Sequence, residues 1–223
     1  MPGFYLLNND NELNTTGKVF PQISQHKGWC YDNYSLLSQL RPDVLPEESL
    51  ILDYLVLHKG AKLTDFVSDS ILFWGFIVSE NVKNILCNCN LPQHRFFELH
   101  IEVDNRMLAN YYWFFPIGNM YSLIDFSKSN FLISHRFLPN QVVTKNVKFK
   151  NISNIKSFES QNSRLRVHGQ SLSFAKEINY DIFQIGGFSF NWIITERLKN
   201  LFNKGNISGY KTKKIDWISM NDE

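Results

Sequence analysis

A pattern of eleven residues in the first half of the chain recurs near its end without a gap. Residues 76–86 align with residues 192–202 at a constant offset of 116 positions, and only one of the pairs is a clear mismatch. The same offset aligns Asp65 with Asp181, Asn90 with Asn206, Leu91 with Ile207 and Leu99 with Ile215. The pattern predicts one supersecondary unit that occurs twice within residues 61–223, around 62–103 and 178–217. Any fold of this chain must therefore accommodate two similar strand-helix-strand units.

Each copy contains the signals of a strand that runs into a capped helix. A hydroxyl residue, Ser79 or Thr195, can accept a hydrogen bond from the free N–H groups of the first helical turn. The glutamates that follow, Glu80 and Glu196, place negative charge at the positive end of the helix dipole. Apolar residues then recur three and four positions apart, which predicts two amphipathic helices. Gly205 is predicted to end the second helix in the left-handed conformation.

Strands are predicted to outnumber helices in the rest of the chain. Apolar and polar residues alternate over residues 97–103, as in a strand with one face in water. Asp104 and Asn105 indicate a tight turn into an apolar strand over residues 107–115, which is predicted to be covered on both faces. Further strands are predicted at residues 4–7, 123–126, 131–134, 142–149, 165–167, 182–185 and 188–194. The fold class is therefore predicted to be α+β, with a largely antiparallel sheet.

The chain is predicted to form a single domain over residues 1–223, because no linker rich in Pro, Gly or Ser divides it. The N-terminal segment 1–60 is the least determined part. Residues 34–40 fit a short helix that Pro42 stops, since proline disfavours helix in the residue before it. Residues 50–57 fit a buried strand and, after Pro46, equally a helix.

Charge and composition point to no default partner. The chain has 23 Lys and Arg against 21 Asp and Glu, and a net charge of +2 is too small to predict nucleic acid or an anionic membrane as a partner. The first residues carry no basic segment and too short an apolar stretch for a secretion signal. The longest apolar run, residues 71–78, is far shorter than the ~20 residues of a membrane helix. We therefore expect a soluble, cytoplasmic protein with no membrane partner.

The three cysteines cannot all pair within one chain, so Cys30, Cys87 and Cys89 are predicted to be reduced thiols. A zinc site of Cys87, Cys89 and His94 is disfavoured, because Cys-x-Cys is not a standard zinc spacing and a fourth ligand is missing. We expect no metal and no cofactor.

Catalytic signatures are missing from the sequence: it has no Gly-rich phosphate loop, no His-Glu-x-x-His, no nucleophile elbow and no dinucleotide fingerprint. The best candidate for acid–base chemistry is the strand face that carries His94, Glu98, His100 and Glu102. The same alternation is typical of a solvated strand face, which we favour. We therefore expect a protein that is not an enzyme, with an enzyme of unrecognised type on this face as the alternative.

Three other groups of residues have both a functional and a structural interpretation. Asp65 and Asp181 could form a paired-carboxylate site, but each is expected to fix a turn or strand end in its own copy. Residues 111–115 could stack bases or anchor a partner, although a core strand is favoured. Residues 145–168 could contact an acidic partner or a phosphate backbone, or form a solvated face. This last stretch holds Lys145, Lys148, Lys150, Lys156, Arg164 and Arg166 against Glu159.

Several segments resemble predicted immunity proteins of bacterial polymorphic toxin systems. The likeness rests on a hydrophobic-Ser-Glu-x-hydrophobic-Lys helix, a Leu-Pro-x-His motif and an aromatic strand, and it covers roughly residues 60–217. The segments are residues 75–86, 90–97, 112–114, 124–131, 195–199 and 207–209. The resemblance implies a small cytoplasmic protein that binds and neutralises a cognate toxin. Such families have no catalytic residues to transfer to this chain.

The leading hypothesis is a non-enzymatic immunity protein whose two repeated units form a scaffold and leave recognition to the outer surface. Immunity proteins that face basic nuclease toxins are often acidic, whereas this chain is slightly basic, so a nuclease toxin is not favoured. The alternatives are the enzyme described above and a nucleic-acid-binding protein that uses residues 145–168.

Overall fold

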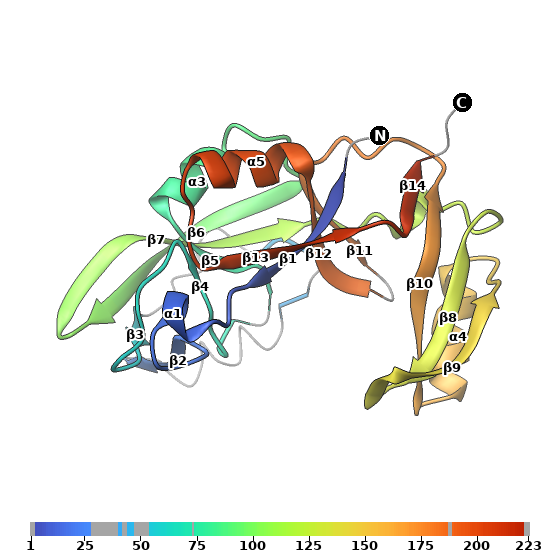
Figure 1. Cartoon of the computed structure of the whole chain (residues 1–223), viewed down its shortest axis with the longest axis horizontal. Helices are drawn as coiled ribbons and strands as arrows, with labels where there is room; N and C mark the ends of the chain where they lie inside the picture. The colour runs from blue at the N-terminus through green and yellow to red at the C-terminus, as the bar shows by residue number, and fades with distance from the viewer. Residues whose placement is uncertain are drawn as a thin grey trace.

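The computed structural model describes residues 3–27, 40–41, 44–46, 54–72, 74–186 and 189–220. Within these ranges the chain forms three sheets and a few short helices, so the fold is α+β (Figure 1). Most of the strand pairs are antiparallel, as predicted. The helix predicted before Pro42, the first half of the ambiguous segment at residues 50–57, and Cys30 lie outside the described residues; the second half, residues 54–57, is a strand.

The largest sheet has six strands in the order β2-β3-β6-β7-β5-β4. They are β2 (Ile23–Lys27), β3 (Tyr54–Leu57), β4 (Phe66–Val67), β5 (Phe76–Ser79), β6 (Gln93–Val103) and β7 (Arg106–Ile117). Asp104 and Asn105 form the predicted turn between β6 and β7, with φ angles of 48° and 64°. The prediction that residues 107–115 are covered on both faces is wrong for the first half of β7, where Met107 is 47% exposed beyond the body of the sheet.

The second sheet has the order β11-β12-β1-β13. Its strands are β1 (Phe4–Asn9), β11 (Ile182–Gly186), β12 (Ser189–Thr195) and β13 (Tyr210–Ile215). The strand nearest the N-terminus therefore lies between two strands from the last part of the chain (Figure 1).

The third sheet has the order β14-β10-β8-β9 and forms a lobe at one end of the molecule (Figure 1). Its strands are β8 (Asn130–His135), β9 (Leu138–Val147), β10 (Leu165–Phe174) and β14 (Ile218–Met220). Helix α4 (Ile152–Gln161), which the sequence analysis missed, buries Ile155 in one core cluster with Phe131 and Val167. The strand predicted at residues 123–126 is wrong, because the chain there leaves a 3-10 turn, η1 (Tyr121–Leu123), and makes a single bridge from Ile124. We refer to residues 118–177 as the β8–β10 lobe.

Helices α3 (Glu80–Leu86) and α5 (Glu196–Lys204) lie side by side over the strands (Figure 1). The predicted caps are present: the Ser79 hydroxyl accepts a hydrogen bond from the Val82 N–H at 3.4 Å, and Thr195 accepts one from Leu198 at 3.3 Å. The prediction for Gly205 is wrong, because its φ is −78° and the next residue, Asn206, takes the positive φ of 50°. A further short helix, α1 (Leu13–Thr16), follows β1.

Strands β4, β5, β7 and β6 have the same order and the same antiparallel directions as β11, β12, β1 and β13. We call these the first set and the second set of strands. On three of the four strands, the residues that occupy matching places are 116 positions apart. The fourth strand has a different place in the chain order, because β7 follows β6 whereas β1 comes before β11, β12 and β13. The matching residues are Phe66 and Ile182, Val78 and Ile194, Glu98 and Lys214, and Tyr112 and Tyr5.

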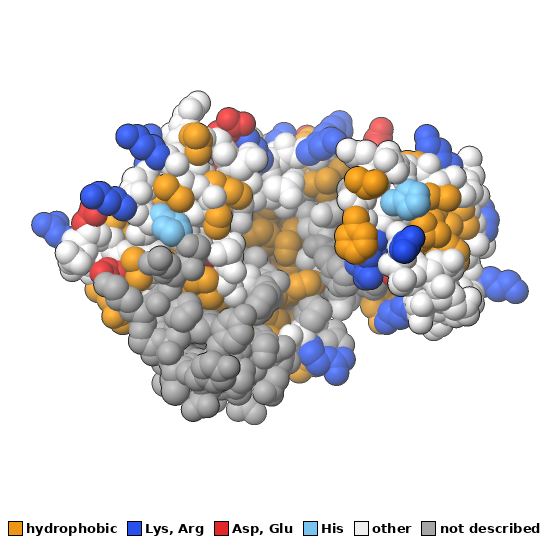
Figure 2. Space-filling model, turned by 90° about the horizontal axis from the view of Figure 1, so that it is seen from below, with side chains coloured by type: hydrophobic (Ala, Val, Ile, Leu, Met, Phe, Trp, Pro, Cys, Tyr) orange, Lys and Arg blue, Asp and Glu red, His pale blue; other side chains and the backbone are white. Residues whose placement is uncertain are grey.

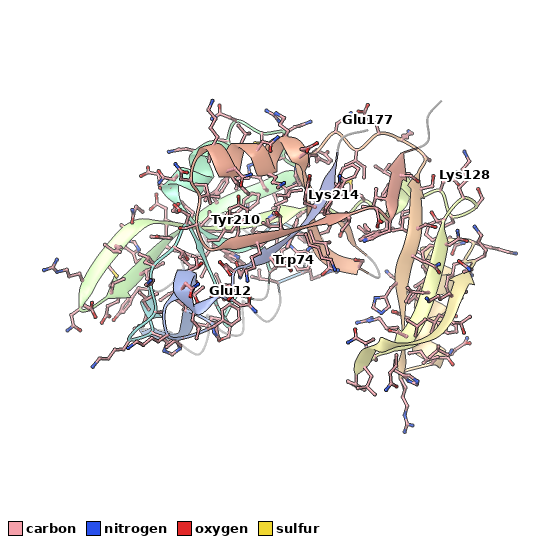
Figure 3. All side chains as sticks on the ribbon, in the orientation of Figure 1. Glu12, Trp74, Lys128, Glu177, Tyr210 and Lys214 are labelled. Atoms are coloured by element: carbon pink, nitrogen blue, oxygen red, sulfur yellow. The ribbon has the colours of Figure 1, made fainter. Side chains whose placement is uncertain are left out.

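The two sets share one core cluster beneath α3 and α5. It contains the matching residues Phe66, Phe76, Val78, Val82 and Leu86 from the first set and Ile182, Trp192, Ile194, Leu198 and Phe202 from the second. Figure 3 labels Trp74 and Tyr210, two aromatic side chains that bridge the sets. The ring of Trp74 lies 5.6 Å from that of Trp192, and the ring of Tyr210 lies 5.7 Å from that of Phe66. Burial of these apolar side chains is the main force that holds the two sets together.

Candidate functional site

The His/Glu face of β6 does not gather into a metal site. Glu98 and His100 are exposed, whereas the His94 ring packs against Phe96 and Phe114, with Nδ1 2.8 Å from the carbonyl oxygen of Pro92. Across the residues that the structure describes, no group of three or more His, Cys, Asp or Glu side chains is arranged to hold a metal ion. His94 thus packs among aromatic side chains, whereas Glu98 and His100 are exposed farther along the strand.

The thiols near the end of α3 are unlike a reactive or metal-binding pair. Cys87 is exposed, and Cys89 is half-buried with its Sγ 3.3 Å from the carbonyl oxygen of Ile85. Burial, together with the charge of Asp181, raises the pKa of Cys89 to about 11. At neutral pH Cys89 is therefore a protonated thiol, the form that is a poor nucleophile and a poor ligand.

Asp65 and Asp181 do not form a paired-carboxylate site, since each carboxylate has its own set of donors. Asp65 Oδ1 accepts a hydrogen bond from the Ser79 hydroxyl at 2.7 Å, and Asp181 Oδ1 accepts one from the Thr195 hydroxyl at 2.8 Å. Ser79 and Thr195 are the last residues of β5 and β12, so each aspartate fixes a strand end within its own set, as predicted.

The second oxygen of each carboxylate reaches the other set of strands, which the sequence analysis did not predict. Asp65 Oδ2 accepts from both the N–H (3.0 Å) and the hydroxyl (2.7 Å) of Ser208, just after α5. Asp181 Oδ2 accepts from the N–H of Asn90, after α3, at 2.9 Å and also pairs with Arg197. The two carboxylates therefore cross-link the sets reciprocally.

The aromatic run at residues 111–115 is part of the core, as favoured. Trp113, Phe114 and Phe115 are fully buried, and the Tyr111 hydroxyl donates a hydrogen bond to the carbonyl oxygen of Thr64 at 3.1 Å. Burial, followed by the charge of Asp65, raises the pKa of Tyr111 to about 12. Only Tyr112 of this run is half-exposed, and Lys83 Nζ lies 3.6 Å from the centre of its ring. These rings are not available to stack bases.

The basic residues of 145–168 all lie on the β8–β10 lobe. Two of them are tied down: Arg166 pairs with Glu159 at 3.1 Å, and Lys148 donates to the carbonyl oxygens of Ser127 and Ser129. The other four, Lys145, Lys150, Lys156 and Arg164, are exposed, and so is Lys148. Residues 118–177 hold nine Lys and Arg against three Asp and Glu, whereas the whole chain holds 23 against 21. The lobe is therefore strongly basic and the rest of the chain is acidic.

Four exposed apolar residues lie on the hairpin of β8 and β9, and the sequence did not predict them. Phe137 is 81% exposed, Leu138 53%, Val142 42% and Val143 49%. We call these four residues the hairpin patch. Arg136 and Phe137 connect the strands, Leu138 lies opposite His135 and Val142 opposite Ser134. Figure 2 shows hydrophobic side chains beside basic ones and a histidine on the surface of this lobe.

One signal in the sequence could have revealed the hairpin patch. Val142 and Val143 are adjacent, so they point to opposite faces of their strand, and only a strand buried on both faces could cover both. β9 is instead the edge strand of its sheet, and α4 covers only the face that carries Phe131 and Val167.

The comparisons give no relative from which a site could be transferred: no family model matches the sequence, and no curated protein matches it significantly. Within the described part of the chain, none of the helices has the length and apolar character needed to cross a membrane.

Proposed function

We propose that this chain is a non-enzymatic immunity protein that binds and neutralises a cognate bacterial toxin in the cytoplasm. The observation that carries the proposal is the hairpin patch, because exposed apolar residues beside charged ones are typical of protein–protein contact sites. The motifs that resemble those of immunity proteins are the reason for proposing a toxin as the binding partner.

We also propose that residues 62–103 and 178–217 are two copies of one unit that serve as a scaffold. The matching registers of the two sets, the paired caps at Ser79 and Thr195, and the lysine of each helix over a tyrosine ring support this interpretation. Lys199 lies 4.2 Å from the ring centre of Tyr5, in the place that Lys83 takes over Tyr112. Residues 118–177 lie between the copies in the chain, so the lobe is free to carry recognition.

Co-expression with toxin domains from the neighbouring reading frames tests the function. We expect one of these domains to form a stable complex with the chain on size-exclusion chromatography, and cells that produce both proteins to grow where cells with the toxin alone do not. Binding to none of the domains, together with no rescue of growth, would remove the proposal.

The enzyme alternative is tested with the same assay. Glu98 and His100 are the exposed members of the His/Glu face, so alanine at both positions leaves the core intact. We expect the double variant to protect cells as well as the unchanged chain does. Loss of protection with the complex still formed would favour catalysis on this face instead.

A further inference from the structure

We infer that the hairpin patch is the contact surface for the partner, and that the partner presents an acidic surface with an apolar centre; this inference rests on the proposed function.

Phe137 is suited to be the anchor of the contact. It is the most exposed large apolar residue in the described part of the chain, and it lies in the two-residue connection at the tip of the hairpin. Aromatic side chains that insert into a partner's pocket carry a large share of the binding energy of an interface, and neighbouring apolar residues exclude water around them. Leu138, the next residue in the chain, is placed to do this for Phe137, whereas Val142 and Val143 lie farther along β9, one on each face.

The positive charge of the lobe indicates that the partner surface is acidic. Arg136 and Lys145 lie in the hairpin itself, and Arg164 is held next to it, since its carbonyl oxygen accepts the N–H of Arg136 at 2.8 Å. Both side chains of this arginine pair are exposed. A basic rim attracts a partner with carboxylates at matching positions and accelerates the encounter. A symmetric contact between two copies through this patch is disfavoured, because two basic lobes would face each other.

The contact is made by side chains and not by the addition of a strand. β9 is an edge strand, but its pairing with β8 shifts register at three places, and Asn146 has a positive φ of 56°. Bulges of this kind prevent the regular ladder that an added strand needs. The patch also has one aromatic residue among aliphatic ones, whereas single-stranded nucleic acid binds surfaces with several aromatic rings for base stacking.

Affinity measurements with an inactive form of the purified toxin domain test this inference. Phe137→Ser and Lys145→Glu change exposed side chains and leave the core unchanged, as thermal unfolding would verify. The matched controls are Met107→Ser, at the other exposed hairpin, and Lys213→Glu, on the exposed part of β13. We expect each test variant to weaken binding about tenfold or more, and each control to leave it unchanged. We also expect the affinity of the unchanged chain to fall as salt is added.

The outcomes separate this inference from the proposed function. Toxin binding that is equally strong in all four variants would overturn the patch as the contact surface and leave the immunity function in place. Failure of the unchanged chain to bind any toxin domain would overturn both. Vesicles of phosphatidylcholine and phosphatidylglycerol and a single-stranded oligonucleotide serve as further probes. If Phe137→Ser abolished binding to one of these probes but not to the toxin domain, the patch would belong to a membrane or nucleic acid and the inference would be wrong.

Discussion

Two aspartates show how single side chains define this structure. Asp65 and Asp181 each use one carboxylate oxygen to hold the hydroxyl that starts a helix, and the other to hold the chain just beyond the helix of the opposite set. The caps themselves were predictable, because a cap and its helix are neighbours in the chain, whereas the first role of the aspartates was predicted only as fixing a turn or a strand end in each copy. The second was not, because Ser208 is 143 positions from Asp65 and the sequence gives no signal of their contact.

We predict that Asp181→Asn lowers the free energy of unfolding by about 1–3 kcal/mol. Thr195 and Asn90 both donate to the carboxylate, so an amide group must turn its NH2 toward one of these donors and leave a nearly buried group without a partner. Urea unfolding followed by circular dichroism measures the change. The control is Asp216→Asn, an exposed aspartate whose replacement should change the free energy by no more than about 0.5 kcal/mol. Equal effects of both substitutions would contradict the role given to Asp181.

The raised pKa of Asp69 predicts how the stability of the fold depends on pH. Burial raises its pKa from 3.8 to about 6, although the N–H groups of Leu72 and Ile71 donate to it and lower the pKa in part. The folded chain therefore holds this proton between about pH 4 and 6 while the unfolded chain has lost it, so the Asp69 contribution to stability falls as the pH rises through this window.

Asp69→Asn should remove this pH dependence, since the amide oxygen can still accept both N–H groups but carries no charge. We expect the variant to be more stable than the unchanged chain at pH 7, and equally stable near pH 4. The gain is at most about 3 kcal/mol, and smaller because the side chain keeps some contact with water. Thermal unfolding at pH 4, 5, 6 and 7 tests the prediction; a variant less stable at pH 7 would show that the negative charge is needed.

At the scale of helices and strands, the elements with local signals were predictable. The caps at Ser79 and Thr195 and the alternation along β6 follow from rules that act over a few residues. Helix α4 was missed because its buried stripe rests mainly on Ile155, with few other apolar residues to mark a period. The hairpin patch was missed because the sequence does not reveal that β9 lies at a sheet edge.

Glycines at the end of α5 distinguish two kinds of turn. Gly209 has a φ of 84°, and a Cβ added to it would lie 2.1 Å from the carbonyl oxygen of Phe66. Gly205 has an ordinary φ, and its Cβ would meet the end of the Ile85 side chain at 2.9 Å and the carbonyl oxygen of Leu201 at 3.3 Å. We predict that Gly209→Ala destabilises the fold by more than about 3 kcal/mol and Gly205→Ala by less than about 1 kcal/mol. Denaturant unfolding of both variants tests this order, and the reverse order would contradict the conformations described.

At the scale of the whole molecule, the two sets of strands form one cooperative structure. The rings of Phe66 and Phe202 lie 5.4 Å apart, those of Phe76 and Trp192 lie 5.6 Å apart, and the aspartate cross-links run in both directions. The cross-links join residues 91 and 143 positions apart, which explains why the packing of the two sets against each other could not be predicted from the sequence.

We predict that damage to one set loosens the other. Asp181→Ala removes the carboxylate that accepts hydrogen bonds from the Thr195 hydroxyl and the Asn90 N–H. We expect hydrogen exchange to become faster in β5 and α3 as well as in β12 and α5. Mass spectrometry of the exchanged protein measures this, with Asp216→Ala as the control. Faster exchange confined to β11, β12 and α5 would show that the sets unfold independently.

The position of β1 has a consequence for synthesis on the ribosome. Tyr5 and Glu196 share a hydrogen bond although they are 191 positions apart, and both neighbours of β1 belong to the last third of the chain. At about 5–20 residues per second, translation leaves this strand without neighbours for about 10–40 seconds. The second sheet can close only after β12 and β13 have emerged, so we expect the nascent chain to depend on chaperones that shield the apolar side chains of β1.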